Sequence, residues 1–210
     1  MVRVLTVASV LVAMLAVTGV RNQALAESRP GIHTYRVPAA RLSLDLPATW
    51  KQIDNRALLA DSALSALVRS NPSLSAMVAL LTQPNPPVKF FAVDPHRRNG
   101  FFSNANVTVG RLPSAMSQDE FLRATKASIA AIEIRRQTFS LVELPGGTAV
   151  RATYQFHLGT PSGKVWLSVR QYAFKRGLSY TTVTYTTLPG IDRLYQPSFI
   201  ASAGSIRFTN

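Results

Sequence analysis

The stretch Phe90–Val109, FFAVDPHRRNGFFSNANVTV, decides how the rest of the sequence is interpreted. Its apolar and alternating ends predict two strands, over Val88–Val93 and Phe101–Leu112. Between them, Asp94–Gly100 contains proline, asparagine and glycine, which are typical of turns. The stretch therefore predicts a strand, a basic turn and a second strand.

The tip of this turn is the candidate contact site, and it consists of His96, Arg97, Arg98 and Asn99. Its three potentially cationic groups lie beside Phe101 and Phe102, so that charge would attract an anionic partner while an aromatic ring anchors it. The alternative is a solvated loop whose two phenylalanines belong to the core. We expect no catalytic residue here, because the stretch contains no recognisable catalytic motif.

Net charge is the most unusual bulk property of the chain. The 210 residues include 23 Lys and Arg against 10 Asp and Glu, a net charge of +13. Such an excess favours anionic partners, although scattered arginines are also typical of an ordinary soluble surface. There is no cysteine, which excludes disulfides, thiolate metal sites and a cysteine nucleophile. The three histidines lack helical ligand spacing, so we expect neither a metal nor another cofactor.

The N-terminal segment has the three parts of an export signal. Arg3 precedes the apolar run Val4–Val20, and an Ala-Leu-Ala triplet ends at Ala26. We predict a signal peptide over residues 1–26 and a secreted or periplasmic protein, with no transmembrane segment in the mature chain. Because the apolar run reaches about 17 residues, the lower limit for a spanning helix, an uncleaved membrane tether is the alternative. Export argues against nucleic acid as a partner.

The mature chain predicts a flexible lead-in at residues 27–32 and a single α+β domain at residues 33–210. Two short strands, His33–Val37 and Arg41–Leu46, open the domain. They close in LDLPATW, where Pro47 ends the second strand and Trp50 folds over the edge of the core.

Helices are predicted at three places. Arg56–Gln83 has two apolar stripes divided at Asn71-Pro72, and it packs on the core or covers a cavity. Ser117–Glu120 is a capping box, which opens a helix to about Ile132. Its predicted buried face contains Phe121, Leu122, Thr125, Ile129 and Ile132. The last helix runs from about Asp192 to Ala203, disturbed at Pro197.

A four-strand antiparallel meander precedes that last helix. Alternating residues and hairpin-length connectors predict strands at Ile134–Leu144, Thr148–Leu158, Lys164–Lys175 and Ser179–Thr187. The alternation indicates that one face of this meander is buried. A short strand, Ser205–Phe208, ends the chain.

The order of these elements, with the motifs LDLPATW, FFAVDP and NANV, resembles the PsbP-like superfamily, in particular its exported bacterial branch of LpqN and DcrB type. The resemblance implies a single antiparallel sheet between helices, an α/β/α sandwich, that serves mainly for binding or assembly. It supplies no catalytic residues, and the chain lacks the N-terminal cysteine of the lipoprotein members.

Two functions remain from the sequence. One is a non-enzymatic binding or assembly module of the bacterial cell envelope that contacts anionic lipid, wall polymer or a protein partner. The other is a carrier that holds an apolar or amphiphilic small molecule between the sheet and the helices of Arg56–Gln83. An enzyme is not expected, because the sequence has no G-x-S-x-G, H-E-x-x-H or glycine-rich phosphate motif.

Overall fold

A computed structural model describes residues 31–53, 86–96, 98–99, 101–160 and 163–209. The predicted signal peptide, most of the lead-in and the Arg56–Gln83 helices lie outside these residues. Within the described ranges, no helix is both long and apolar enough to cross a membrane.

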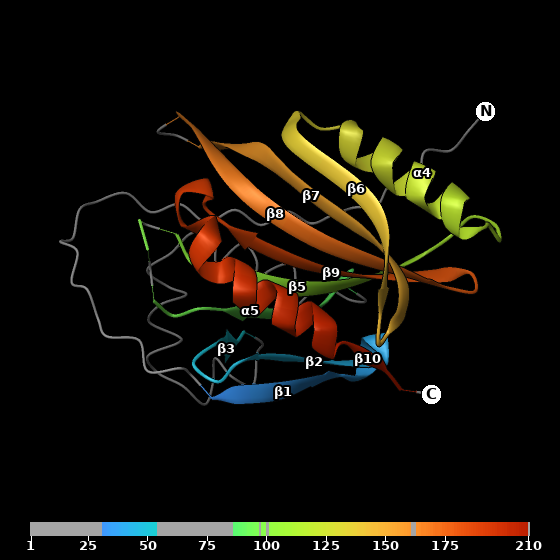
Figure 1. The fold of residues 1–210 in the computed structure, drawn as a ribbon, viewed down its shortest axis with the longest axis horizontal. Helices are drawn as coiled ribbons and strands as arrows, with labels where there is room; N and C mark the ends of the chain where they lie inside the picture. The colour runs from blue at the N-terminus through green and yellow to red at the C-terminus, as the bar shows by residue number, and fades with distance from the viewer. Residues whose placement is uncertain (1–30, 54–85, 97, 100, 161–162, 210) are drawn as a thin grey trace.

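The described strands form two antiparallel sheets (Figure 1). In the small sheet, β2 (Leu42–Pro47) lies between β1 (Ile32–Val37) and β10 (Arg207–Phe208). The large sheet has the order β3-β4-β5-β9-β8-β7-β6. Its strands are β3 (Lys51–Gln52), β4 (Val88–Val93), β5 (Asn104–Arg111), β6 (Ile134–Leu144), β7 (Gly147–Thr160), β8 (Gly163–Arg176) and β9 (Ser179–Thr187).

The prediction of a single sheet is therefore wrong. β2 ends at Pro47, and the Trp50 N–H donates to the Pro47 carbonyl at 2.9 Å in a tight turn. Because the chain turns there, it leaves the small sheet and enters β3 in the large one. A period of two identifies strands but does not say which strands pair, so the sequence could not separate the sheets.

The predicted meander is confirmed, since β6, β7, β8 and β9 pair consecutively and antiparallel. The β8–β9 hairpin turns at Gly177, whose positive φ of 58° suits glycine. The prediction that only one face of the meander is buried is wrong for β9, where every residue from Tyr180 to Thr187 is buried. This strand pairs with β5 as well as β8, so it lies in the middle of the sheet rather than at its edge.

Helices cover both faces of the large sheet (Figure 1). Phe121 of α4 (Gln118–Ala130) packs with Val150 and Ala173 on one face. On the other face, α5 (Asp192–Ser205) lies between the large sheet and β2, and its Phe199 shares a core with Leu44 and Tyr185. The two helices and the sheet between them agree with the predicted α/β/α layering.

Local predictions were largely accurate. The Ser117–Glu120 capping box is present in both directions, because charge and hydrogen-bond geometry at a helix start are local. Trp50 is buried and packs edge-on against Phe199, as expected of a residue covering the core. Ile132 is an exception: α4 ends at Ala130, and the side chain is 43% exposed.

Element boundaries differ by a few residues from the predicted ones. β1 begins at Ile32, the last residue of the expected lead-in. β5 begins only at Asn104, because Phe101 pairs back with Arg98 across the turn. α5 continues through Pro197 to Ser205, which leaves the final strand two residues long.

Candidate binding site at the Asp94–Phe101 turn

The turn between β4 and β5 is closed by backbone hydrogen bonds at two levels. The Asp94 N–H donates to the Ser103 carbonyl at 2.8 Å. Nearer the tip, Arg98 and Phe101 exchange N–H···O bonds of 3.0 and 2.9 Å. Asn99 has a positive φ of 50°, a conformation that asparagine tolerates better than most residues. The sequence forms a turn here because Asp94-Pro95 initiates it and Asn99 accepts the left-handed geometry.

The Asp94 carboxylate organises the base of the turn. Its Oδ1 accepts from the His96 backbone N–H at 3.0 Å, which is the Asx-turn arrangement. The same oxygen lies 2.9 Å from Nδ1 of His96. Asp94 is 6% exposed, so these hydrogen bonds compensate for a charge that has largely left water.

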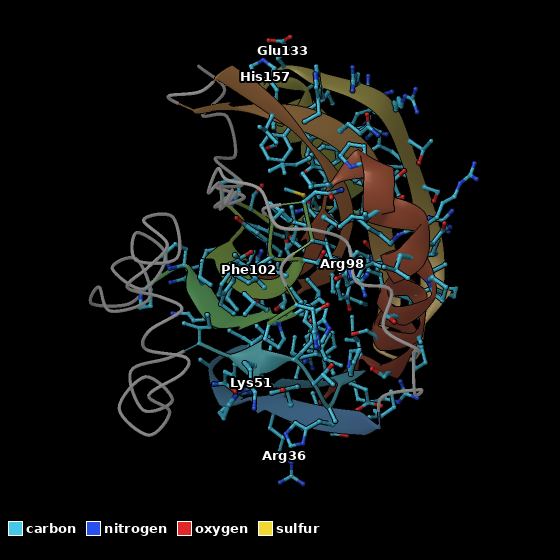
Figure 2. All side chains as sticks on the ribbon, turned by 90° about the vertical axis from the view of Figure 1, so that its left-hand side faces the viewer. Arg36, Lys51, Arg98, Phe102, Glu133 and His157 are labelled. Atoms are coloured by element: carbon cyan, nitrogen blue, oxygen red, sulfur yellow. The ribbon has the colours of Figure 1, made fainter. Side chains whose placement is uncertain are left out.

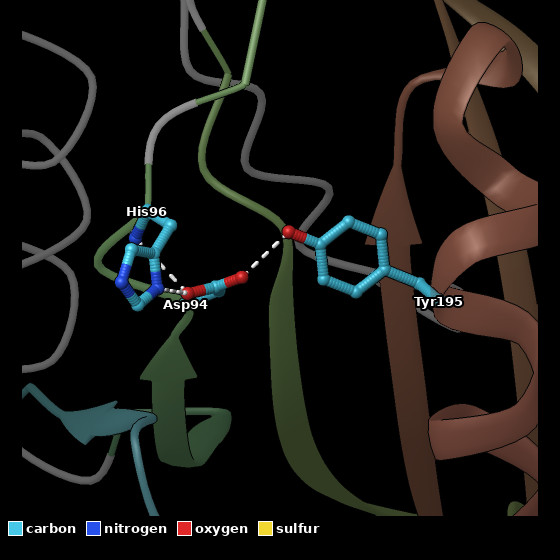
Figure 3. Close-up of polar contacts among 3 residues, drawn as sticks. All are labelled: Asp94, His96 and Tyr195. Carbon is cyan, nitrogen blue, oxygen red and sulfur yellow. Dashed lines mark hydrogen bonds and ion pairs between the residues drawn. The ribbon is translucent and has the colours of Figure 1, made fainter. Parts of the chain in front are cut away.

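A tyrosine from α5 donates a further hydrogen bond to that carboxylate. Tyr195 donates its hydroxyl to Oδ2 of Asp94 at 2.6 Å, across 101 positions of sequence (Figure 3). Burial raises the pKa of Tyr195 to about 12, and the hydrogen bond to Asp94 and its negative charge add to the rise. Hydrogen bonds with Ser103 and Arg98 lower this pKa in part. The phenol therefore stays protonated at neutral pH and fixes the turn to α5.

The described residues of the predicted contact site are exposed, whereas the two phenylalanines beside them are buried. His96 is exposed, with 58% of its side chain accessible, and Arg98 and Asn99 are exposed too. Arg97 lies outside the described residues. Figure 2 shows Phe102 within the molecule, and Phe101 and Phe102 are 1% and 2% exposed. The expectation that these rings anchor a partner is wrong, and the alternative that both belong to the core is confirmed.

Asp94 and His96 have the relationship of an orienting carboxylate and an imidazole, as in hydrolase triads. Among the described residues, no hydroxyl is hydrogen-bonded to the outer nitrogen of His96. Ser103 is buried, and its Oγ lies 2.8 Å from Oγ1 of Thr187. The arrangement holds a turn in place and presents a basic tip.

Three residues that contribute to this site were not identified by the sequence analysis. Asp94 is given no role there beyond the first position of the turn, although Asp-Pro-His is a recognisable Asx-turn signal. Tyr195 and Ser103 gave no signal, because their role depends on the packing of α5 beside the end of β4.

The polar side of β5 carries two asparagines. Asn104 donates to the Phe102 carbonyl at 3.2 Å, so this amide satisfies a neighbouring backbone group. The same face carries a buried band of amides and hydroxyls: Asn104, Asn106, Thr108, Thr182, Thr184 and Thr186. Such a band suits polar neighbours better than the apolar ligand of the carrier model.

Comparison with solved structures identifies the fold. Cyanobacterial PsbP from Synechocystis sp. PCC 6803 superposes with a TM-score of 0.52 at 11% identity, covering 90% of this chain and 98% of that one. LpqN of Mycobacterium tuberculosis, which is involved in cell envelope biogenesis, gives 0.51 at 7% identity, covering 86% and 91%. The chain has a PsbP-like fold. A Pseudomonas aeruginosa protein of unknown function gives 0.50 at 12% identity, covering 83% and 94%.

No family model matches the chain, and no curated protein matches it. At these identities the likeness shows the PsbP-like fold and leaves function to the individual sites.

Proposed function

We propose that this chain is an extracytoplasmic, non-enzymatic binding module of the cell envelope, which contacts an anionic partner through the tip His96–Asn99. The anchoring of the turn by Asp94 and Tyr195 is the observation that carries the proposal. A turn that is anchored at its base loses less entropy on binding than a free loop does. The predicted export signal and the fold shared with LpqN support an envelope location.

Charge is the attractive element of the proposed contact. The chain carries a net +13, and His96 and Arg98 are exposed in the turn that follows β4, the strand paired with β3. An anionic lipid surface, an acidic wall polymer or an acidic protein face would each be attracted. The carrier model depends on the Arg56–Gln83 helices, which lie outside the described residues, and no observation favours it.

Co-sedimentation with vesicles of phosphatidylglycerol and phosphatidylcholine, from low to high salt, tests the lipid form of this contact. Each basic residue near an anionic membrane contributes about 1 kcal/mol, so Arg97→Ala/Arg98→Ala should weaken binding roughly 30-fold at low salt. A matched control, Arg36→Ala/Arg111→Ala, removes the same charge at the small sheet and at the far end of β5.

Equal weakening of the two double variants would mean that net charge acts alone and that the turn has no special role. If the turn variant binds vesicles and an acidic wall polymer as tightly as the unmodified protein, the assignment of His96–Asn99 is wrong.

A further inference from the structure

A second polar site lies beside the first turn of α5, away from the Asp94–Phe101 turn. It is a groove of about 210 Å³ between α5 and the α5-facing side of β7 and β8. Thr153 pairs with Arg170 across these strands, and Gln155 pairs with Ser168. All four residues line the groove.

Arg170 has a hydrogen-bonding capacity that the described part of the chain does not use. Its Nε is buried and has no hydrogen-bond partner among the described residues. Burying a guanidinium N–H without an acceptor is costly. An anionic ligand in the groove would supply that acceptor.

A second arginine reaches the groove through an irregularity of the backbone. β6 shifts its register on β7 between Arg135 and Thr138, and Arg136 within this bulge has a positive φ of 52°. Arginine is not favoured in that conformation, and β-bulges next to sites redirect side chains. Arg136 lines the groove together with Arg170.

The neighbouring Arg135 orients the amide of Gln155. Its Nε donates to Oε1 of Gln155 at 3.0 Å, and its guanidinium carbon lies 3.6 Å from the centre of the Trp166 ring. Since the amide oxygen of Gln155 is engaged, its NH₂ group is the part that remains to serve a ligand. The groove therefore offers donors from two arginines, one amide and the Ser168 hydroxyl.

Asp192 is the acidic member of the groove, at the first position of α5. Its carboxylate repels an anion, but it accepts hydrogen bonds from hydroxyl groups. A ligand that carries both an anionic group and a hydroxyl would satisfy both sides.

We propose that this groove binds the phosphate monoester of a small polyhydroxy compound. Two arginine forks and further donors match three phosphate oxygens better than the two oxygens of a carboxylate. Asp192 would accept from the hydroxyl of the same ligand. The phosphate can belong to a soluble metabolite or to a lipid headgroup, because the recognised chemistry is the same. This site goes beyond the envelope contact proposed for the turn.

Calorimetric or NMR titration of the full chain with glycerol 3-phosphate tests the proposal. We expect saturable binding that weakens at least tenfold in Arg170→Gln and in Arg136→Gln. Arg36→Gln, which removes an equal charge from an exposed position on β1, should bind as the unmodified protein does (Figure 2). Vesicles containing phosphatidic acid form the second arm, and the same variants should lose that binding if a lipid is the source.

A variant that should bind more tightly distinguishes a specific loss of binding from a loss caused by misfolding. Asp192→Asn removes the opposing carboxylate, so inorganic phosphate should bind several-fold more tightly, whereas Asp119→Asn on α4 should have no effect. The proposal is overturned if neither phosphate probe binds, or if acetate binds with equal affinity. It is also overturned if Arg36→Gln loses as much binding as the groove variants, or if Asp192→Asn leaves the affinity for inorganic phosphate unchanged.

Discussion

The Asp94–Phe101 turn and the groove beside α5 are both polar and basic, but they use their polar groups differently. In the turn, Asp94 accepts hydrogen bonds from His96 and from Tyr195. In the groove, Arg170 has a buried donor with no partner in the described part of the chain, and Arg136 has an unfavourable backbone conformation. Polar groups with hydrogen-bond partners stabilise a fold, whereas unsatisfied polar groups and local backbone strain are typical of ligand-binding sites. Substitutions in the two regions should therefore affect stability in opposite ways.

The largest effect is expected from Asp94→Ala. This change removes the acceptor of the Asx turn and leaves the buried Tyr195 hydroxyl without the carboxylate that accepts its hydrogen. The free energy of unfolding should fall by about 2–4 kcal/mol in chemical denaturation. Asp119→Ala, which removes an exposed carboxylate on α4, is the control and should cost under about 1 kcal/mol. Similar losses in both would show that Asp94 does not anchor the turn.

Tyr195→Phe separates the hydrogen bond from the packing of the ring. The ring stays stacked on Phe199, at 5.7 Å between centroids, while Asp94 loses one donor. We expect a loss of about 1–2 kcal/mol in the same denaturation experiment. Hydrogen exchange at the Asp94 and Phe101 amides should quicken as well. Unchanged exchange would mean that the backbone bonds alone hold the turn.

Alkaline pH should weaken the same anchor. The pKa of Tyr195 is raised to about 12 in the folded chain, against an ordinary value near 10. Its contribution is therefore fully present below pH 10 and is lost as the pH rises towards 12. The stability of the unmodified protein should fall across this window more steeply than that of Tyr195→Phe. Parallel curves would contradict the assigned shift; the other buried tyrosines contribute equally to both proteins.

In the groove, Arg136→Gly should stabilise the protein slightly. Glycine adopts a positive φ without steric cost, although it loses more backbone entropy on folding. We expect a gain of about 0.5 kcal/mol in unfolding free energy together with weaker phosphate binding. Arg207→Gly, at a position without positive φ, is the control and should not gain stability. A clear loss in Arg136→Gly would mean that the bulge depends on the arginine side chain.

Arg170→Met should have the smallest effect on stability. The methionine keeps most of the apolar stem and removes the Nε that has no partner among the described residues, so the free energy of unfolding should change by less than about 0.5 kcal/mol. Arg176→Met is the comparison, because that guanidinium lies 4.5 Å from the centre of the Phe208 ring. If Arg170→Met is strongly destabilising, the side chain serves the fold rather than a ligand.

The sequence predicted well the features that depend on neighbouring residues. The capping box at Ser117, the hairpins of the meander and the strand Val88–Val93 follow from hydrogen bonds and periodicities within a few positions. The PsbP-like fold was predicted from the order of these elements, and the solved structures agree. His96, Arg98 and Asn99 lie at a turn as predicted, while the role of the tip in binding stays a prediction.

Tertiary structure decided which of these elements meet. Tyr195 reaches Asp94 across 101 positions, and Arg136, Arg170 and Asp192 line one groove from three separate elements. It also divided the strands into two sheets and placed Phe101 and Phe102 in the core. The physical reason is that periodicity and turn chemistry are local, whereas strand partners and buried polar contacts depend on the packing of segments distant in sequence. The sequence alone therefore determined the elements and the basic turn, and the packing of α5 determined both sites.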